Sequence, residues 1–301
     1  MKILITGGSG LVGSRLTQML INKGIEVKWL SRTAGKKDGI DCFRWDYKTN
    51  YIDEKAFEGV THLVHLAGAG VFEKRWSASY KKEIYDSRIK TTQLLVQYLP
   101  KVQSLKAFVC GTAIGIYGNS LQKNLLEEDA GNGSDFLAKT TVDWEKAADT
   151  NIPPGIRTVK IRTGIVLAKD AGALPAMVQP IKFLIGSPLA SGEQIISWIH
   201  LDDLCNIFIK AIEDEGMNGV YNGVAPTPLS NKVFSKTIAA VIKKPLIMPN
   251  VPAFALNVIL GKEKAYSVVE GIPVSSAKIQ KAGFTFIFPT LEKALNDLLA
   301  T

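Results

Sequence analysis

Short apolar runs alternate with amphipathic stretches along the first 166 residues of this chain. Runs of strand length lie at residues 3–6, 26–30, 41–45, 61–66, 107–112 and 157–166. Between them, apolar side chains recur at helical spacing, most clearly at residues 11–20, 81–99 and 142–148. Strands that alternate with helices are typical of a parallel sheet covered on both faces. The pattern therefore predicts an α/β protein built on a doubly wound parallel sheet.

The first strand-to-helix transition carries a glycine pattern. The strand ends at Thr6, and Gly7, Gly10 and Gly13 follow. Glycines at this spacing permit a tight turn, close approach of the backbone to a pyrophosphate, and close packing of the helix on the strand. An ordinary loop is the alternative interpretation. Because a strand precedes the glycines and a helix follows them, we predict a dinucleotide site.

The helix after this turn begins at Leu11 and Val12. Its first backbone N–H groups have no acceptor within the helix and can bind a phosphate. Gly24 is expected to end the helix. We therefore assign cofactor binding to Gly7, Gly10, Leu11, Val12 and Gly13.

The end of the second strand indicates which dinucleotide binds. An NAD site usually places Asp or Glu about 20 residues after the glycines, to hold the ribose hydroxyls. This chain has Ser31 and Arg32 there. A hydroxyl and a guanidinium bind a 2′-phosphate, which a carboxylate would repel. We therefore expect NADP(H) rather than NAD, with Arg32 as a solvated turn residue the alternative. Asp46, after the third strand, is expected to meet the adenine edge.

A small-residue turn follows the strand at residues 61–66 and contains Ala67 and Gly68. In an open α/β sheet the carboxyl ends of the strands face the ligand crevice. We therefore place Ala67 and Gly68 against the cofactor. His65, inside the strand, is expected to be a hydrogen-bonded core residue.

Length and composition fit this interpretation. A chain of 301 residues with 46% hydrophobic content is long enough for a nucleotide domain and a smaller second domain. Uncharged apolar stretches stay shorter than a membrane span, and the first strand begins at once, so we expect neither a membrane segment nor a secretory signal. Cys42, Cys110 and Cys205 show no metal-ligand spacing and are expected to be reduced core residues of a cytoplasmic protein.

The formal net charge of +8 does not by itself indicate nucleic acid. Basic residues are scattered among acidic ones, and no nucleic-acid-binding motif accompanies them. A phosphate-rich cofactor and a phosphorylated small-molecule substrate would use positive charge equally well. The pattern leaves the oligomeric state open, and we expect no metal site.

The composition changes after residue 165 to segments interrupted by Pro and Gly. We therefore predict a nucleotide-binding domain at residues 1–165, to which the chain returns near residues 195–225. A smaller substrate domain is expected at residues 166–301.

Several motifs occur together and in a fixed order. They are the glycine turn and the segments 65–68, 112–118, 162–164 and 198–203. This order resembles the short-chain dehydrogenase/reductase superfamily in its extended, epimerase/dehydratase-like form, which implies a Rossmann-type fold. Residues 74–76, 87–88, 136–138, 143–145 and 221–226 resemble an atypical branch called the epimerase family, a group of sugar-nucleotide epimerase-like proteins. The segments 252–261 and 281–291 resemble that branch's C-terminal domain of unknown function.

The chain departs from the superfamily where proton transfer takes place. Superfamily enzymes use a Tyr and a Lys four residues later, the phenol exchanging a proton with substrate. With Glu145 as anchor, Leu137 stands in the Tyr position and Thr141 in the Lys position. Neither side chain can do that chemistry. Lys139 is two residues from Thr141 and points to a different helix face. The usual dyad is therefore absent.

Two hydroxyls are candidates for a replacement proton donor. Thr112 resembles the superfamily's substrate-orienting Ser/Thr, but a strand-end Thr also often bonds to backbone. Tyr117 offers a phenol, although a Tyr before a loop Gly more often packs its ring. Arg75 and Arg88 are candidates for binding a substrate phosphate or carboxylate, with solvated helix charges as the alternative. His200, before two aspartates, is a further candidate substrate contact.

Two functions remain open from the sequence. One is an NADP(H)-dependent oxidoreductase or epimerase whose substrate is unknown and of which a nucleotide sugar is one candidate. The other is a non-catalytic NADP(H)-binding protein that reports redox state to a partner. The missing Tyr and Lys favour the second function, whereas Thr112 and the second domain favour the first.

Overall fold

The computed structural model describes residues 1–118 and 124–299, which form two compact units. The first unit comprises residues 1–113, 139–162 and 205–221. The second comprises residues 114–118, 124–138, 163–204 and 222–299.

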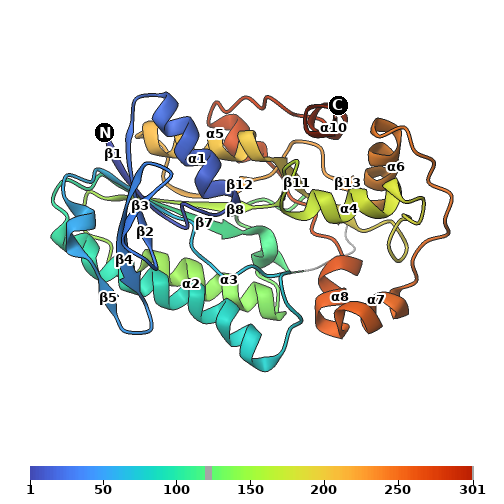
Figure 1. Cartoon of the computed structure of the whole chain (residues 1–301), viewed down its shortest axis with the longest axis horizontal. Coiled ribbons are helices and arrows are strands. Elements are labelled where there is room, and N and C mark those ends of the chain that lie inside the picture. Colours follow the sequence, from blue (N-terminus) through green and yellow to red (C-terminus); the bar gives the residue numbers. More distant parts are fainter. Residues whose placement is uncertain (119–123, 300–301) are drawn as a thin grey trace. The chain divides into compact units, whose positions relative to one another are not determined.

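A mostly parallel sheet forms the centre of the first unit. Among the described residues nine strands join it, with β12, β8, β7, β6, β1, β2, β4 and β3 in that spatial order and β5 paired to β4 (Figure 1). β1 pairs in parallel with β2 and β6, β2 with β4, and β6 with β7. The main strands are β1 (Lys2–Thr6), β2 (Glu26–Ser31), β4 (Ile40–Asp46), β6 (His62–His65), β7 (Ala107–Ala113), β8 (Arg157–Thr163) and β12 (Gly219–Gly223).

Helices cover both faces of this sheet, as a doubly wound fold requires. In Figure 1, α1 and α5 lie on one face and α2 and α3 on the other. Their bounds are Leu11–Asn22 for α1, Ala78–Tyr98 for α2, Phe136–Asp149 for α3 and Leu201–Glu213 for α5. The predicted α/β class with a Rossmann-type parallel sheet is therefore confirmed.

The core of the first unit explains why the sequences of its strands are almost entirely apolar. Leu4, Leu63 and Phe108, on the adjacent strands β1, β6 and β7, are fully buried. Leu95 of α2 and Ala148 of α3 belong to the same cluster and are also fully buried. Parallel strands buried on both faces have few positions at which a polar residue reaches water.

Two short strands of this sheet were not predicted. β3 (Gly35–Lys37) and β5 (Tyr51–Ile52) pair antiparallel with β4 at the sheet edge. All three residues of β3 are exposed, so no alternation of apolar and polar side chains marks it. Pairing with β4, rather than local pattern, makes these segments extended.

The predicted strand at residues 157–166 is two strands. It divides at Gly164 into β8 and β9 (Ile165–Leu167), and β9 pairs with β11 (Trp198–His200) in the second unit. A Cβ atom at Gly164 would lie 2.7 Å from the Ser197 carbonyl oxygen. Glycine is therefore required for the close approach of these two backbones.

The second unit is built around Trp198 and Phe234, both almost fully buried. The Trp198 indole N–H donates to the Thr227 carbonyl at 3.0 Å. β10 (Ile195–Ile196) and β13 (Leu229–Ser230) form a short antiparallel pair. The helices of this unit are α4 (Ala173–Lys182), α6 (Asn231–Val241), α7 (Ala253–Leu260), α8 (Lys262–Val269), α9 (Ala277–Lys281) and α10 (Leu291–Leu299).

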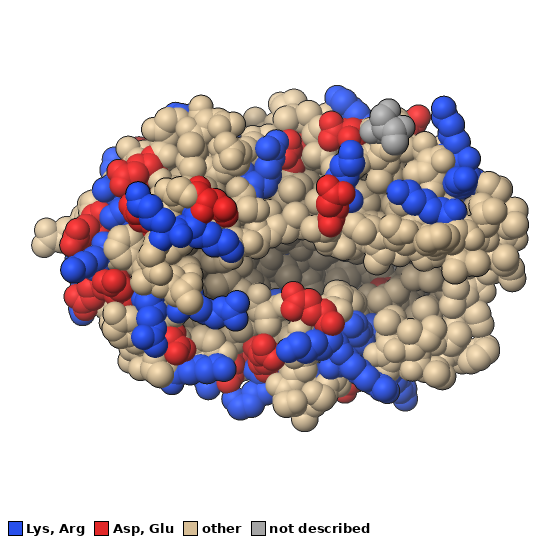
Figure 2. Space-filling view, viewed as in Figure 1, with Lys and Arg blue, Asp and Glu red and all other residues tan. Residues whose placement is uncertain are grey.

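The surface of the first unit mixes charges of both signs. On the face drawn in Figure 2, basic and acidic side chains alternate over the strands and helices of this unit. Within the described part of the chain, every helix is too short or too polar to cross a membrane.

Candidate functional site

The glycine turn after β1 is packed against the end of β6. Gly7 has φ +70°, and a Cβ atom there would lie 2.8 Å from the Leu66 carbonyl carbon and oxygen. A Cβ atom at Gly13 would lie 2.2 Å from the Gly7 carbonyl oxygen. Both positions therefore require glycine for the fold itself.

Gly10 is different, because its backbone angles do not require glycine and an added Cβ atom would need only a small shift of one neighbour. Its φ of −81° and ψ of 175° are open to any residue. An added Cβ atom would meet only the Gly7 carbonyl oxygen, at 3.3 Å. Gly10 is also the N-cap of α1, whose first turn contains no acidic side chain. The space before this helix terminus, with the N–H groups of Leu11, Val12 and Gly13, fits an anionic ligand.

Ser31 and Arg32 lie at the carboxyl end of β2, next to β1 in the sheet. The Ser31 hydroxyl donates to the Thr33 carbonyl at 2.9 Å and accepts from the Thr33 N–H. Arg32 is exposed, and within residues 1–118 and 124–299 no carboxylate pairs with it. Its guanidinium is therefore available to an anion that arrives from solution.

Asp46 ends β4, the strand beside β2. The parallel register aligns Ser31 with Arg44, so Asp46 stands two residues further along β4. Its carboxylate accepts from the Lys48 N–H at 2.9 Å, which shapes the turn that follows. This geometry leaves the adenine contact of Asp46 as a prediction.

A hydrogen-bond chain fixes the turn at Ala67 and Gly68. The Thr6 Oγ1 atom accepts from the N–H groups of Leu66 and Ala67 at 3.1 and 3.2 Å, so its own proton goes to His65 Nδ1 at 2.6 Å. The other ring nitrogen, Nε2, then carries the proton and donates to Thr92 Oγ1 at 3.0 Å. His65 is fully buried, and burial is the main reason that its pKa falls to about 3. It is a hydrogen-bonded core residue, as predicted, and it is neutral.

Thr112, at the carboxyl end of β7, is held by a buried ion pair. Its hydroxyl donates to Glu145 Oε1 at 3.0 Å. Arg162 binds the same carboxylate with two hydrogen bonds of 2.8 Å, Nε to Oε1 and Nη2 to Oε2. All three side chains are buried. Sequence reasoning used Glu145 only as a reference position and missed this bidentate pair, because nothing local links two residues 17 positions apart.

Leu137, Thr141 and Glu145 follow one another at four-residue spacing along α3. Thr141 and Glu145 are both buried in the first unit, whereas Lys139 is exposed. Neither a phenol nor an ammonium group occupies the two positions of the usual dyad.

Tyr117 and His200 lie in the second unit, and both are buried. The Tyr117 hydroxyl donates to Asn222 Oδ1 at 2.7 Å. His200 Nδ1 accepts from the Asp202 N–H at 3.1 Å, and Nε2 lies 3.2 Å from Asp297 Oδ2. A ligand contact by His200 therefore requires one of these bonds to open.

Arg75 and Arg88 belong to the first unit but differ in their surroundings. Arg75 is exposed and precedes α2. Arg88, on α2, is partly buried, and Nη1 donates to the Ile84 carbonyl at 3.0 Å. Groups of His, Cys, Asp or Glu suited to a metal ion are absent from the described residues.

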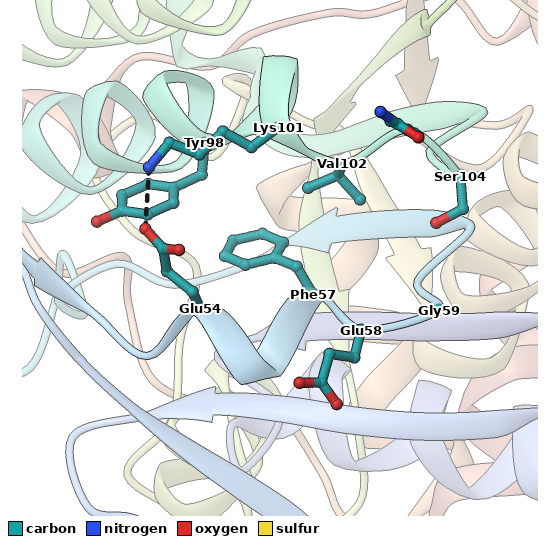
Figure 3. A pocket seen from close by; sticks show the side chains of 9 residues that line it. Glu54, Phe57, Glu58, Gly59, Tyr98, Lys101, Val102 and Ser104 are labelled. Atoms are coloured by element: carbon teal, nitrogen blue, oxygen red, sulfur yellow. Dashed lines mark hydrogen bonds and ion pairs between the residues drawn. The ribbon is translucent and has the colours of Figure 1, made fainter.

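A pocket of about 430 Å³ lies near the amino ends of β6 and β7 (Figure 3). Gly59 and Ser104 line it just before β6 and β7 begin. Phe57 stacks on Tyr98 at 5.7 Å between ring centroids, and Lys101 pairs with Glu54 at 2.9 Å. Ligands of open α/β sheets bind at the carboxyl ends of the strands. This pocket is therefore not the dinucleotide site.

The lowered pKa of His65 predicts a pH-dependent stability. The unfolded chain takes up a proton near pH 6.5, whereas the folded protein does so only near pH 3. Stability from this group is therefore complete above pH 6.5 and falls by about 1.4 kcal/mol per pH unit below it. Urea unfolding of the parent and of His65→Gln between pH 7.5 and 4.5 should show a shallower pH dependence in the variant. Parallel curves would contradict the neutral assignment.

Comparison with known proteins places the chain in a family. Residues 3–222 match the NAD dependent epimerase/dehydratase family, and residues 251–298 match the domain of unknown function DUF1731. The epimerase family protein YfhF of Bacillus subtilis is 36% identical over 303 residues, which span 100% of this chain and 98% of the relative. The human epimerase family protein SDR39U1 is 34% identical over 308 residues, covering 100% of both chains.

Solved structures agree with these matches. The crystal structure of human SDR39U1 (isoform 2) with NADPH has a TM-score of 0.89 at 32% identity and covers 99% of each chain. A nucleoside-diphosphate sugar epimerase from Corynebacterium glutamicum has a TM-score of 0.81 at 29% identity, over 99% of this chain and 58% of that chain. The Thermus thermophilus UDP-glucose 4-epimerase complex with NAD shares the fold, with a TM-score of 0.76 at 18% identity. The resemblance seen in the sequence is confirmed, and the chain belongs to the NAD dependent epimerase/dehydratase family.

Proposed function

We propose that this protein is an NADP(H)-binding oxidoreductase or epimerase. The observation that carries the proposal is Gly10, whose backbone angles do not require glycine and which leaves the N-terminus of α1 without a side-chain cap. The free N–H groups at the start of α1, next to a residue without a side chain, suit the pyrophosphate of a dinucleotide. Ala67 and Gly68 border the same turn.

Arg32 supports NADP(H) over NAD. Arg32 is exposed without a carboxylate partner among the described residues, it follows Ser31 in the sequence, and β2 ends without an acidic residue. This donor set suits a 2′-phosphate. The human relative with a TM-score of 0.89 was crystallised with NADPH, which agrees with this assignment.

A bound nicotinamide would supply hydride transfer. The chain must then hold or move the substrate proton, and Thr112 and Tyr117 are our candidates. Both hydroxyls already donate within the protein, Thr112 to Glu145 and Tyr117 to Asn222. Each keeps lone pairs with which to accept a hydrogen bond from a substrate hydroxyl. Proton donation by either residue requires its present bond to exchange.

We assign the substrate to residues 166–301, with His200 as a candidate contact there and a nucleotide sugar as the candidate class. Arg75, in the first unit, stays a separate candidate for a substrate anion. The similarity to a protein described as a nucleoside-diphosphate sugar epimerase, at 29% identity, supports that class. Residues 1–165 and the returning segment 195–225 are assigned to the cofactor.

A second function is favoured by the absent dyad. With Leu137 and Thr141 in place of Tyr and Lys, the protein would bind NADP(H) and report redox state without turnover. Incubation of the NADP⁺-loaded protein with UDP-sugars, and of the NADPH-loaded protein with their 4-keto forms, distinguishes the two functions. Loss of nicotinamide absorbance at 340 nm, or a new sugar epimer by NMR, supports the enzyme. Neither change with any sugar supports the non-catalytic function.

Replacing Arg32 tests the cofactor choice. Arg32→Ala should weaken NADP⁺ binding by about 10- to 100-fold, the size of a lost charge-assisted contact, and leave NAD⁺ binding unchanged. Isothermal titration with both dinucleotides measures this. Lys101→Ala is the matched control, because it removes a cation from the pocket near the amino ends of β6 and β7. Equal affinities of the parent protein for both dinucleotides would rule out the assignment.

Gly10 and Gly13 give a paired test of the phosphate cradle. Gly10→Val should keep the fold, since its backbone angles suit any residue and the Gly7 carbonyl oxygen, 3.3 Å from an added Cβ atom, needs to move by only a few tenths of an ångström. The variant should lose at least about tenfold in dinucleotide affinity. Gly13→Ala should lower the melting temperature, because its Cβ atom would overlap the Gly7 carbonyl oxygen. Circular dichroism and titration separate the two effects. A Gly10→Val protein with unchanged affinity would place the phosphates elsewhere.

A further inference from the structure

Arg88 is a partly buried cation without a counter-charge. Its Nη1 atom donates to the Ile84 carbonyl, and its Cζ atom lies 5.3 Å from the centroid of the Trp144 ring. Among the described residues no carboxylate lies within ion-pair distance of it. A backbone carbonyl and an indole face leave most of the five guanidinium N–H donors for another acceptor.

Burial lowers the pKa of the Arg88 guanidinium to about 10, so it stays charged at neutral pH. A charged group removed from water without a counter-charge is costly. An anion that binds Arg88 would offset this cost, and such an anion must come from outside the described chain.

The guanidinium lies next to Gly68, in the turn after β6. A Cβ atom added at Gly68 would lie 3.3 Å from Arg88 Cζ and 3.5 Å from both Nη atoms. Gly68 directly follows Ala67, whose N atom would lie 2.9 Å from a Cβ atom at Gly7. Gly7, Ala67, Gly68 and Arg88 therefore form one continuous row of contacts within the first unit.

The strand order sets the direction of this row. β1 lies between β2 and β6, so Arg32, at the end of β2, and Gly68, after β6, are on opposite sides of the glycine turn. Neighbouring strands are about 4.8 Å apart, which separates these ends by about 10 Å. A dinucleotide with its 2′-phosphate at Arg32 and its pyrophosphate at the turn extends its nicotinamide half toward Arg88.

The position of Arg88 is fixed by the same hydrogen-bond chain that shapes the turn. Thr92 Oγ1, which accepts the His65 Nε2 proton, donates its own proton to the Arg88 carbonyl at 2.6 Å. The chain thus runs from the Ala67 N–H through Thr6, His65 and Thr92 to the backbone of Arg88. Ser87 joins the two segments again, because its hydroxyl accepts from the Ala69 N–H at 2.9 Å.

We propose that Arg88 binds the phosphate on the nicotinamide side of the dinucleotide, across the glycine turn from Arg32. This inference rests on the proposed NADP(H) site and adds to it a second cation with a different target. It moves Arg88 from the substrate, where the sequence placed it, to the cofactor.

Binding of three ligands distinguishes the roles of Arg32 and Arg88. NADP⁺ carries both the 2′-phosphate and the nicotinamide-side phosphate, NAD⁺ lacks the first, and 2′,5′-ADP lacks the second. Arg88→Met removes the guanidinium and keeps an aliphatic stem. It should weaken NADP⁺ and NAD⁺ by the same factor of about 10 to 100 and leave 2′,5′-ADP unchanged. Arg32→Ala, the matched variant, should weaken NADP⁺ and 2′,5′-ADP and leave NAD⁺ unchanged.

Other outcomes overturn the inference. Unchanged dinucleotide affinities in Arg88→Met would return Arg88 to a substrate anion, and a loss confined to NADP⁺ would place it at the 2′-phosphate. Weaker 2′,5′-ADP binding would place it on the adenosine side. If the parent protein binds neither dinucleotide, the proposed function itself fails.

A second variant covers the case in which Arg88→Met does not fold. Gly68→Ala leaves the charge in place and pushes the guanidinium away by a few tenths of an ångström, since the added Cβ atom would lie 3.3 Å from Cζ. It should show the same selective loss at smaller size, with NADP⁺ and NAD⁺ weakened and 2′,5′-ADP retained. Unchanged affinity for all three ligands would contradict the proposal.

Discussion

The Thr6 hydroxyl links the carboxyl ends of β1 and β6, where the candidate site lies. It accepts two backbone N–H groups from the turn after β6 and donates its one proton to His65. All hydrogen-bonding capacity of a hydroxyl is then used, and this sets the direction of every bond that follows. His65 must be neutral, with its proton on Nε2, and burial enforces that state. A proton on Nδ1 would leave Thr6 without an acceptor and loosen the turn that borders the glycines.

The parts of the fold that the sequence predicted are those with local causes. The glycine turn, the buried strands and the long helix α2 follow from residue type and period within a short window. β3 was not predicted, because its three residues are all exposed and are extended only through pairing with β4. The division of one predicted strand at Gly164 also has a distant cause, since Ser197 determines how close the two backbones approach.

The candidate site residues also divide into those with local causes and those with distant causes. Arg32 was identified because its position after a strand is informative by itself. The role of Glu145 depends on Arg162, and the surroundings of Arg88 depend on Trp144 and Gly68, which lie far from it in sequence. His200 was selected for its two neighbouring aspartates, yet Asp203 turns away to accept the N–H groups of Ile287 and Phe288. A sequence shows which side chains are available but not which of them already have partners.

Partnering, rather than charge alone, distinguishes the arginines of the first unit. The chain has 36 basic and 28 acidic residues, so a net positive charge by itself selects no site. Arg162 is neutralised by Glu145, and Arg157 donates to the carbonyls of Met217 and Ala211. Arg32, Arg88 and Arg157 all lack a carboxylate among the described residues, and position sets the first two apart, because they lie on either side of β1. An anion gains most from cations that no internal carboxylate has already neutralised. The two flanking arginines therefore give the edge of an otherwise mixed surface a polarity that matches an extended ligand with phosphates at separated positions.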